Sequence, residues 1–162
     1  MEYKPTATIK DIMDSLVDPS ADFIWESVGT VVSAAGSEDR VPKTPEEWAN
    51  VRRRAIALIE SPNLLIVPGR RVARPGEKSE NPQVELEPAE MQTLIDQDRQ
   101  TFISLAHALQ DAAVLALEAI DAKNAEALVD AGGKIDIACE NCHLKYWYPN
   151  QKIPDFPLPA KP

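Results

Sequence analysis

The sequence predicts an all-α protein, an antiparallel four-helix bundle over residues 1–148 followed by a proline-rich tail over residues 149–162. Apolar residues recur at spacings of three and four, and no stretch alternates apolar and polar residues as a half-buried strand would. Breaks rich in proline and glycine divide this pattern into four tracts, which favours a bundle of helices. At 162 residues the chain fits one domain with its own core.

The first tract predicts a broken helix. Five apolar residues of segment 6–17 form one helical stripe: Ile9, Ile12, Met13, Leu16 and Val17. Asp18 and Pro19 then form an N-cap and a first helical residue, so we expect the helix to restart there and run through Val32. Residues 36–43 are expected to form a polar turn.

The second tract begins with a clear N-terminal signal. Thr44, Pro45 and Glu47 give a capping box with proline at the first helical position. Pro62 is expected to kink or restart this helix because proline has no N–H to donate. Residues 68–88, which contain four prolines, are expected to form a long solvated connection without visible chemistry.

The third and fourth tracts complete the expected bundle. A helix over about 88–123 is expected, with an interruption near residues 96–98, and Asn124 is expected to cap the last helix. The inward face of that helix contains Leu128, Gly132, Ile135, Cys139, Cys142, His143 and Tyr146. Gly132 and Gly133 cost stability inside a helix, which indicates close approach of a neighbouring group.

The charge of the chain excludes some partners. A net charge of −9 argues against nucleic acid, because phosphate binding needs clustered lysine and arginine. No run approaches the ~18 consecutive apolar residues that a membrane span needs. The acidic surface suits a basic docking partner, although the same acidity would also simply keep a monomer soluble.

The motif with chemistry is Cys139-Glu140-Asn141-Cys142-His143. This spacing is typical of c-type haem attachment, in which two thiols bond the vinyl groups and the adjacent imidazole binds the iron. On a helix the three residues share a face. The competing interpretations are a redox-active cysteine pair and half a zinc site, but neither a βαβ pattern nor a second ligand pair accompanies the motif.

With this motif at the end of the last helix, residues 6–148 resemble the class II c-type cytochromes, the cytochrome c-prime family. Tyr146 matches the family pattern that follows the motif, whereas Trp147 stands where a basic residue is expected. The resemblance implies one covalent haem c and export to a bacterial periplasm after loss of a signal peptide, which the N-terminus here lacks. Members of that family often form homodimers through the first two helices, and the sequence leaves monomer and dimer both open.

The sixth iron position divides that family. Its low-spin members use a methionine of the first helix, which makes Met13 the expected distal ligand; a thioether suits iron and raises its potential. Met13 would alternatively be a core gap-filler. Met91 and His107 are the competing ligands.

Two further cofactor contacts are expected. Arg70 follows Pro68 and Gly69 and would pair with a haem propionate, unless it simply lies in a solvated loop. Trp25 follows Met13 closely enough to line the distal side, although aromatic residues at such spacing are more often plain core.

The sequence leaves three functions open. The leading hypothesis is a non-enzymatic, one-electron carrier with His143 and Met13 on the iron, which exchanges electrons with a redox partner protein. The alternative is a five-coordinate protein that binds nitric oxide or carbon monoxide and therefore needs an open distal position. The third is a haem-free helical interaction module.

Overall fold

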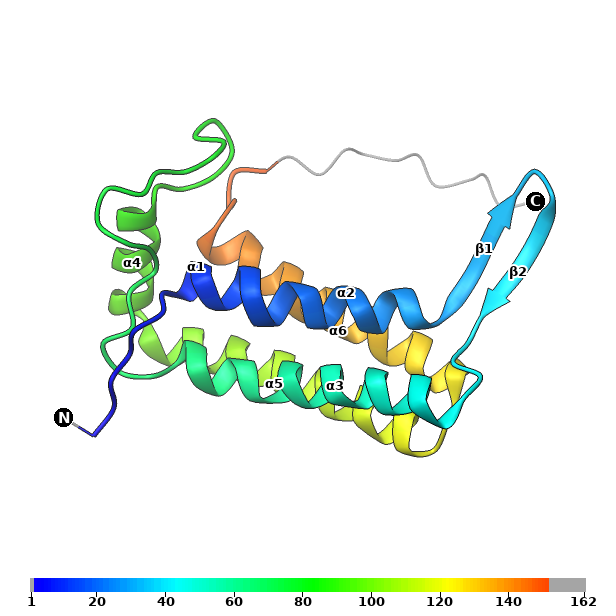
Figure 1. Ribbon diagram of the computed structural model, residues 1–162. Coiled ribbons are helices and arrows are strands. Elements are labelled where there is room, and N and C mark those ends of the chain that lie inside the picture. The colour runs from blue at the N-terminus through cyan, green and yellow to red at the C-terminus, as the bar shows by residue number, and fades with distance from the viewer. Residues whose placement is uncertain (1, 152–162) are drawn as a thin grey trace.

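The computed structural model describes residues 2–151, which form helical segments and one β-hairpin (Figure 1). In chain order they are α1 (Ile9–Ile12), the π-helical η1 (Met13–Val17), α2 (Asp18–Ser27), β1 (Gly29–Ser33), β2 (Gly36–Arg40), α3 (Pro45–Leu65), α4 (Pro88–Gln97), α5 (Arg99–Asp121) and α6 (Ala125–Tyr146). Most of the predicted tail, residues 152–162, lies outside the described residues.

The prediction of an all-α four-helix bundle is wrong. Two strands form an antiparallel sheet in which Gly29 pairs with Arg40 and Ser33 with Gly36, and α4 is a further helix set apart at the other end of the molecule (Figure 1). The helix expected to reach Val32 stops at Ser27, because Gly29 takes a φ of 132° and β-branched residues follow it. The strands escaped prediction because their side chains are nearly all exposed and so show no alternation.

The first three helical segments, α1, η1 and α2, form one continuous rod. Thr8 caps its start in a reciprocal capping box with Asp11. The expected break at Asp18 is instead a wide π turn, in which the Asp18 N–H donates to the Met13 carbonyl. Pro19 has no N–H, so a regular α-helical register would leave the carbonyl four residues earlier without its donor. The π turn lies just before this proline and contains Met13.

The other helix boundaries follow the sequence closely. The Thr44 and Glu47 capping box begins α3, as predicted, but Pro62 neither ends nor restarts this helix, which continues to Leu65. Pro62 lies in the last turn, where few backbone bonds depend on it. The expected interruption is confirmed at Asp98, whose side chain accepts from the Thr101 N–H at 3.1 Å and caps α5.

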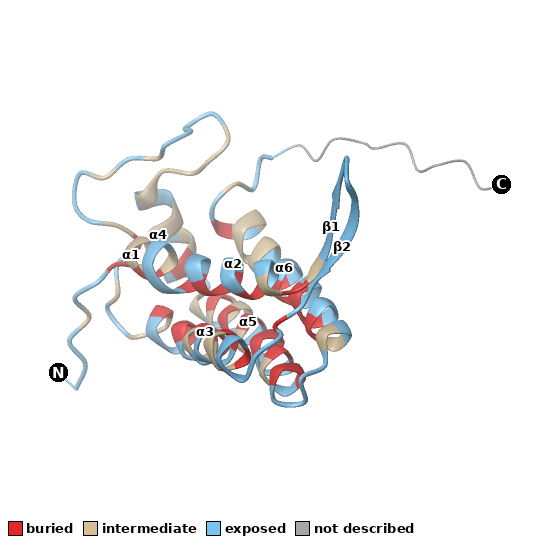
Figure 2. Ribbon diagram, turned by 45° about the vertical axis from the view of Figure 1, so that its right-hand side comes forward, coloured by how far each residue is buried: buried red, intermediate tan, exposed pale blue. Residues whose placement is uncertain are grey.

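The core lies where α5 packs against α3 and α6 (Figure 2). Residues of α5 such as Phe102, Leu109, Ala113 and Ala116 are buried there. By length and composition alone, α5 is apolar enough to cross a membrane. Its buried stripe gives that apolarity a role in the core of the molecule.

The loop over residues 66–87, here called the strap, is more than a solvated connection. Its Arg71 and Val72 carbonyls accept from the Ile9 and Lys10 N–H groups at 2.9 and 3.0 Å. These donors belong to the first turn of α1, where N–H groups have no partner within the helix. At its other end, the Leu86 N–H donates to the Trp147 carbonyl at 2.7 Å. The strap therefore ties the start of α1 to the end of α6.

Candidate haem site

A cavity of about 240 Å³ is lined in part by residues of α4 and the strap. These elements lie at the end of the molecule opposite the hairpin (Figure 1). Its walls come from the rod, the strap, α4, α5 and the end of α6. The residues used below are Lys10, Met13, Asp18, Lys78, Met91, Cys142, His143, Tyr146 and Trp147.

Of the residues predicted to hold the cofactor, the structure brings three to this cavity. Cys142 and His143 reach it from the last two turns of α6, and Met13 reaches it from the first residue of η1. Cys139 lies one turn earlier on α6 and is partly buried against the core. Cys139 does not itself line the cavity, and Asp18, which does, is one of the charges that raise the pKa of its thiol.

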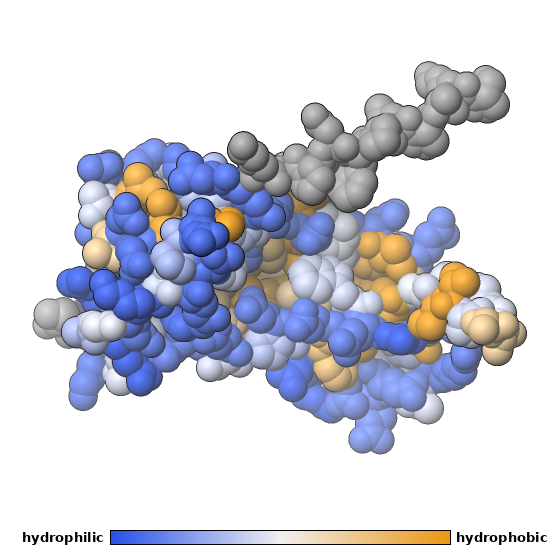
Figure 3. Space-filling view, turned by 90° about the horizontal axis from the view of Figure 1, so that it is seen from above, coloured by the Kyte–Doolittle hydropathy of each residue, from blue (hydrophilic) through white to orange (hydrophobic). Residues whose placement is uncertain are grey.

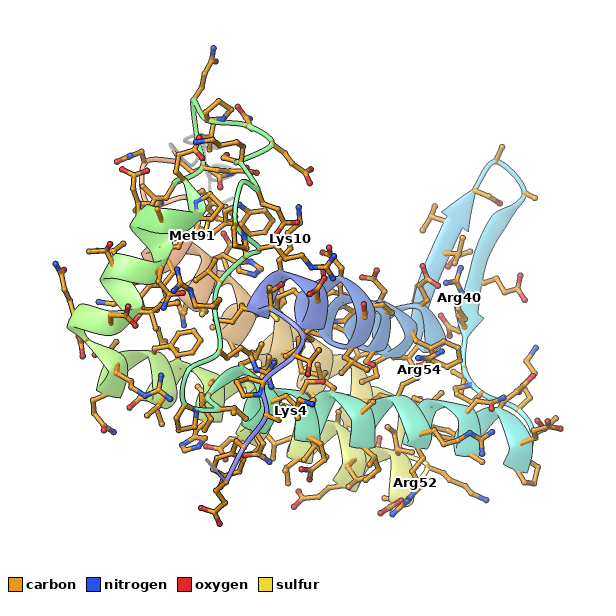
Figure 4. All side chains as sticks on the ribbon, turned by 60° about the vertical axis from the view of Figure 1, so that its left-hand side comes forward. Lys4, Lys10, Arg40, Arg52, Arg54 and Met91 are labelled. Carbon is orange, nitrogen blue, oxygen red and sulfur yellow. The ribbon has the colours of Figure 1, made fainter. Side chains whose placement is uncertain are left out.

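Of the two competing iron ligands, Met91 lines the cavity and His107 does not. His107 is exposed on α5 and does not line the cavity. Met91 does line it, from α4, and Figure 4 shows Met91 at the same end of the molecule as Lys10 of α1. Two thioethers, Met13 and Met91, therefore share the cavity with the His143 imidazole.

Trp25 and Arg70 lie elsewhere. The Trp25 Nε1–H donates to the Gly132 carbonyl at 3.0 Å, so the indole seals the contact between α2 and α6. The Arg70 guanidinium donates to the carbonyls of Leu64 and Ala7, which joins the end of α3 to the segment before α1. Neither residue lines the cavity that holds His143.

Sequence reasoning missed the cations that do line the cavity, Lys10 and Lys78. Lys10 forms an ion pair with Glu80 at 3.3 Å, and Lys78 lies 4.0 Å from Glu87. Lys10 directly follows Ile9, the first residue of the predicted apolar stripe, but is not part of that stripe. Lys78 lies in the strap, and the sequence does not predict the path of this loop. The backbone bonds between the strap and α1, with the Lys10–Glu80 ion pair, place the two lysines at one cavity.

Both cysteines are free thiols that are unlike reactive ones. Burial raises the pKa of Cys139 to about 12 and that of Cys142 to about 11. Redox-active cysteines have a lowered pKa, because the thiolate is the nucleophile. Among residues 2–151 no group of three or more metal-binding side chains gathers, so a closed zinc site has no support there either.

The surroundings of His143 are aromatic. The Trp147 ring stands edge-on to the imidazole with centroids 5.0 Å apart, in the position where the family pattern has a basic residue. Burial lowers the pKa of His143, partly opposed by the charge of Glu140, so the ring is neutral at pH 7. A neutral imidazole is the form that binds metals.

The residues present fit a covalent haem. The donor set is right in kind: two thiols on one helix face, a neutral imidazole and a thioether. Tyr146 lines the cavity, and its buried hydroxyl has no hydrogen-bond partner among residues 2–151, whereas buried polar groups normally have one. The cavity volume of about 240 Å³ is below the ~300–1,000 Å³ typical of small-molecule pockets, so this cavity would enclose a haem only in part.

Comparison with protein-family models, with curated proteins and with solved structures finds no significant match to this chain. The resemblance to class II cytochromes therefore rests on the motif at residues 139–143, on Tyr146 and on the place of the motif in the chain.

Proposed function

We propose that the chain is a c-type cytochrome that transfers single electrons, with haem bound covalently through Cys139 and Cys142. The observation that carries this proposal is the meeting of Cys142, His143 and Met13 at one cavity, although Met13 and His143 are 130 residues apart in sequence. Bound there, the haem would supply an iron centre that alternates between the ferric and ferrous states.

His143 and Met13 are the proposed axial ligands. Rigid elements hold both: His143 lies in the last turn of α6, and Met13 lies in the π turn whose position Pro19 accounts for. Ligands placed on helices change position little between oxidation states, which keeps the reorganisation on electron transfer small. If His143 and Met13 both bound the iron, the protein would leave no position on it for a substrate, and electron transfer would require no acid or base.

Lys10 and Lys78 are the proposed partners of the haem propionates. Both line the cavity and both already face carboxylates, Glu80 and Glu87, which a propionate would replace or join. An ammonium group stabilises a carboxylate of the cofactor as it does one of the protein. The net charge of −9 favours a redox partner with a basic docking surface, and export to a periplasm remains part of the proposal.

The test is the absorption spectrum of the protein produced with haem-attachment machinery. We expect a low-spin spectrum that becomes high-spin in Met13→Ala, with rapid carbon monoxide binding to the reduced variant. Met91→Ala is the matched control, since it removes a second thioether from the same cavity, and it should leave the spectrum low-spin. A high-spin wild type that Met13→Ala leaves unchanged would contradict the ligation and favour gas binding.

A further inference from the structure

The hydrogen bonds behind His143 continue beyond the motif. The Tyr148 hydroxyl lies 3.2 Å from His143 Nδ1 and donates to Glu140 Oε2 at 3.0 Å. Glu140 belongs to the motif itself, between the two cysteines, and Tyr148 lies two residues after the end of α6. The His143, Tyr148 and Glu140 side chains therefore form one chain of hydrogen bonds.

The direction of these bonds follows from a count of protons. The Tyr148 hydroxyl has a single proton, and a carboxylate only accepts hydrogen bonds, so that proton points to Glu140. The hydroxyl oxygen can then only accept from His143, which requires the proton of the neutral imidazole to lie on Nδ1. Nε2 keeps its lone pair, which is the state in which it binds iron.

We propose that Tyr148 and Glu140 are positioning residues, which hold His143 with its proton on Nδ1 and its Nε2 lone pair free for the iron. The inference rests on the proposed function, since iron ligation gives the free nitrogen its role. A carboxylate that acts through a hydroxyl on an imidazole N–H makes the ligand more basic. A more basic ligand stabilises ferric iron and lowers the reduction potential.

The presence of Trp147 in place of a basic residue changes the charge near His143. The family pattern places a basic residue there, whereas this chain has an indole beside the imidazole and a carboxylate behind it. The charge that acts on His143 through hydrogen bonds is therefore negative in this chain.

The experiment has two readouts on the full chain. The first is the position of the His143 proton, from nitrogen-15 NMR of the chain purified without haem. We expect Nδ1–H in the wild type. In Tyr148→Phe the preference should be lost, and in Glu140→Ala it should reverse toward Nε2–H, because the hydroxyl proton is then free to point at Nδ1. Tyr3→Phe and Glu118→Ala, both exposed, are the controls.

The second readout is the reduction potential of the haem-loaded protein, which should shift upward in Tyr148→Phe and Glu140→Ala relative to their controls. Wild-type His143 with its proton on Nε2, or potentials unchanged in both variants, would overturn the inference. A chain that shows the Nδ1–H form but takes up no covalent haem would contradict the proposed function while supporting the hydrogen-bond chain. The two failures are thus distinct.

Discussion

The two adjacent glycines of α6 meet different surroundings. A Cβ built on Gly132 would lie 3.1 Å from Trp25 Cδ1, whereas one on Gly133 would meet nothing within 4 Å. The Trp25 indole is also bonded to the Gly132 carbonyl, so moving the ring would weaken that bond. The close approach expected from the sequence is therefore confirmed at Gly132, and the neighbour is a tryptophan of α2.

Because their surroundings differ, replacing each glycine with alanine should have opposite effects on stability. Gly133→Ala should stabilise the protein by about 1 kcal/mol, since alanine is the better helix former. Gly132→Ala gains the same backbone contribution but overpacks Trp25, which costs on the order of 1–3 kcal/mol. Urea unfolding of both variants checks this. A Gly132→Ala variant as stable as Gly133→Ala would show that the indole moves aside freely.

The site residues on one local motif were predictable, and those brought together by the tertiary fold were not. The helix that carries residues 139–143 and the place of Met13 on the apolar stripe of the first helix follow from spacing, because a helix places its residues at fixed intervals. Lys10, Lys78 and Tyr148 depend on the path of the strap and on the turn after α6. The guanidinium of Arg70, expected to pair with a propionate, instead donates to the Leu64 and Ala7 backbone carbonyls.

Among the elements, the strap connects the rod, α4 and α6. Besides its backbone bonds to α1, its Val72 N–H donates to Gln92 Oε1 of α4 at 2.9 Å, and Arg74 pairs with Asp11 at 3.1 Å. Val72 is buried, so its N–H has no easy access to water. The Gln92 side chain is thus a specific link between α4 and the strap.

Removal of that link should loosen the cavity wall. Gln92→Ala leaves the Val72 N–H without an acceptor, which costs about 1–3 kcal/mol. We expect a lower urea midpoint and faster hydrogen exchange at the Ile9 and Lys10 amides, whose acceptors lie on the strap. Gln97→Ala is the matched control, because Gln97 is exposed at the end of the same helix. Equal exchange rates in the two variants would exclude a role of Gln92 in holding the strap.

The fold class was mispredicted where side chains are exposed. The capping residues Thr44 and Asn124 gave the correct starts of α3 and α6, and the buried faces predicted the helices themselves, because burial imposes the 3.6-residue period on the sequence. Gly29, Gly36 and β-branched residues determine the hairpin. Because both faces of the hairpin are exposed to solvent, its sequence shows no alternation of apolar and polar residues. The π turn at Met13 is likewise invisible in a pattern of apolar residues.

At the scale of the whole molecule, the two ends differ in character. One end holds the cavity with its two thioethers, the Cys142 thiol and the His143 imidazole, and the other end carries the hairpin. Figure 3 shows apolar side chains gathered over the hairpin, where Val31 and Val32 are 44% and 79% exposed. The long helices span the distance between these ends, so chemistry at the cavity is separate from any contact that the hairpin makes (Figure 1).

The central claim is that Cys139 and Cys142 bind a haem covalently. Intact mass spectrometry of the full chain, produced in a cell with haem-attachment machinery, measures this most directly. We expect a mass increase of one haem that survives denaturation and is lost in the Cys139→Ser, Cys142→Ser double variant. A wild-type chain at its unmodified mass, with no haem retained after denaturation, would contradict the account.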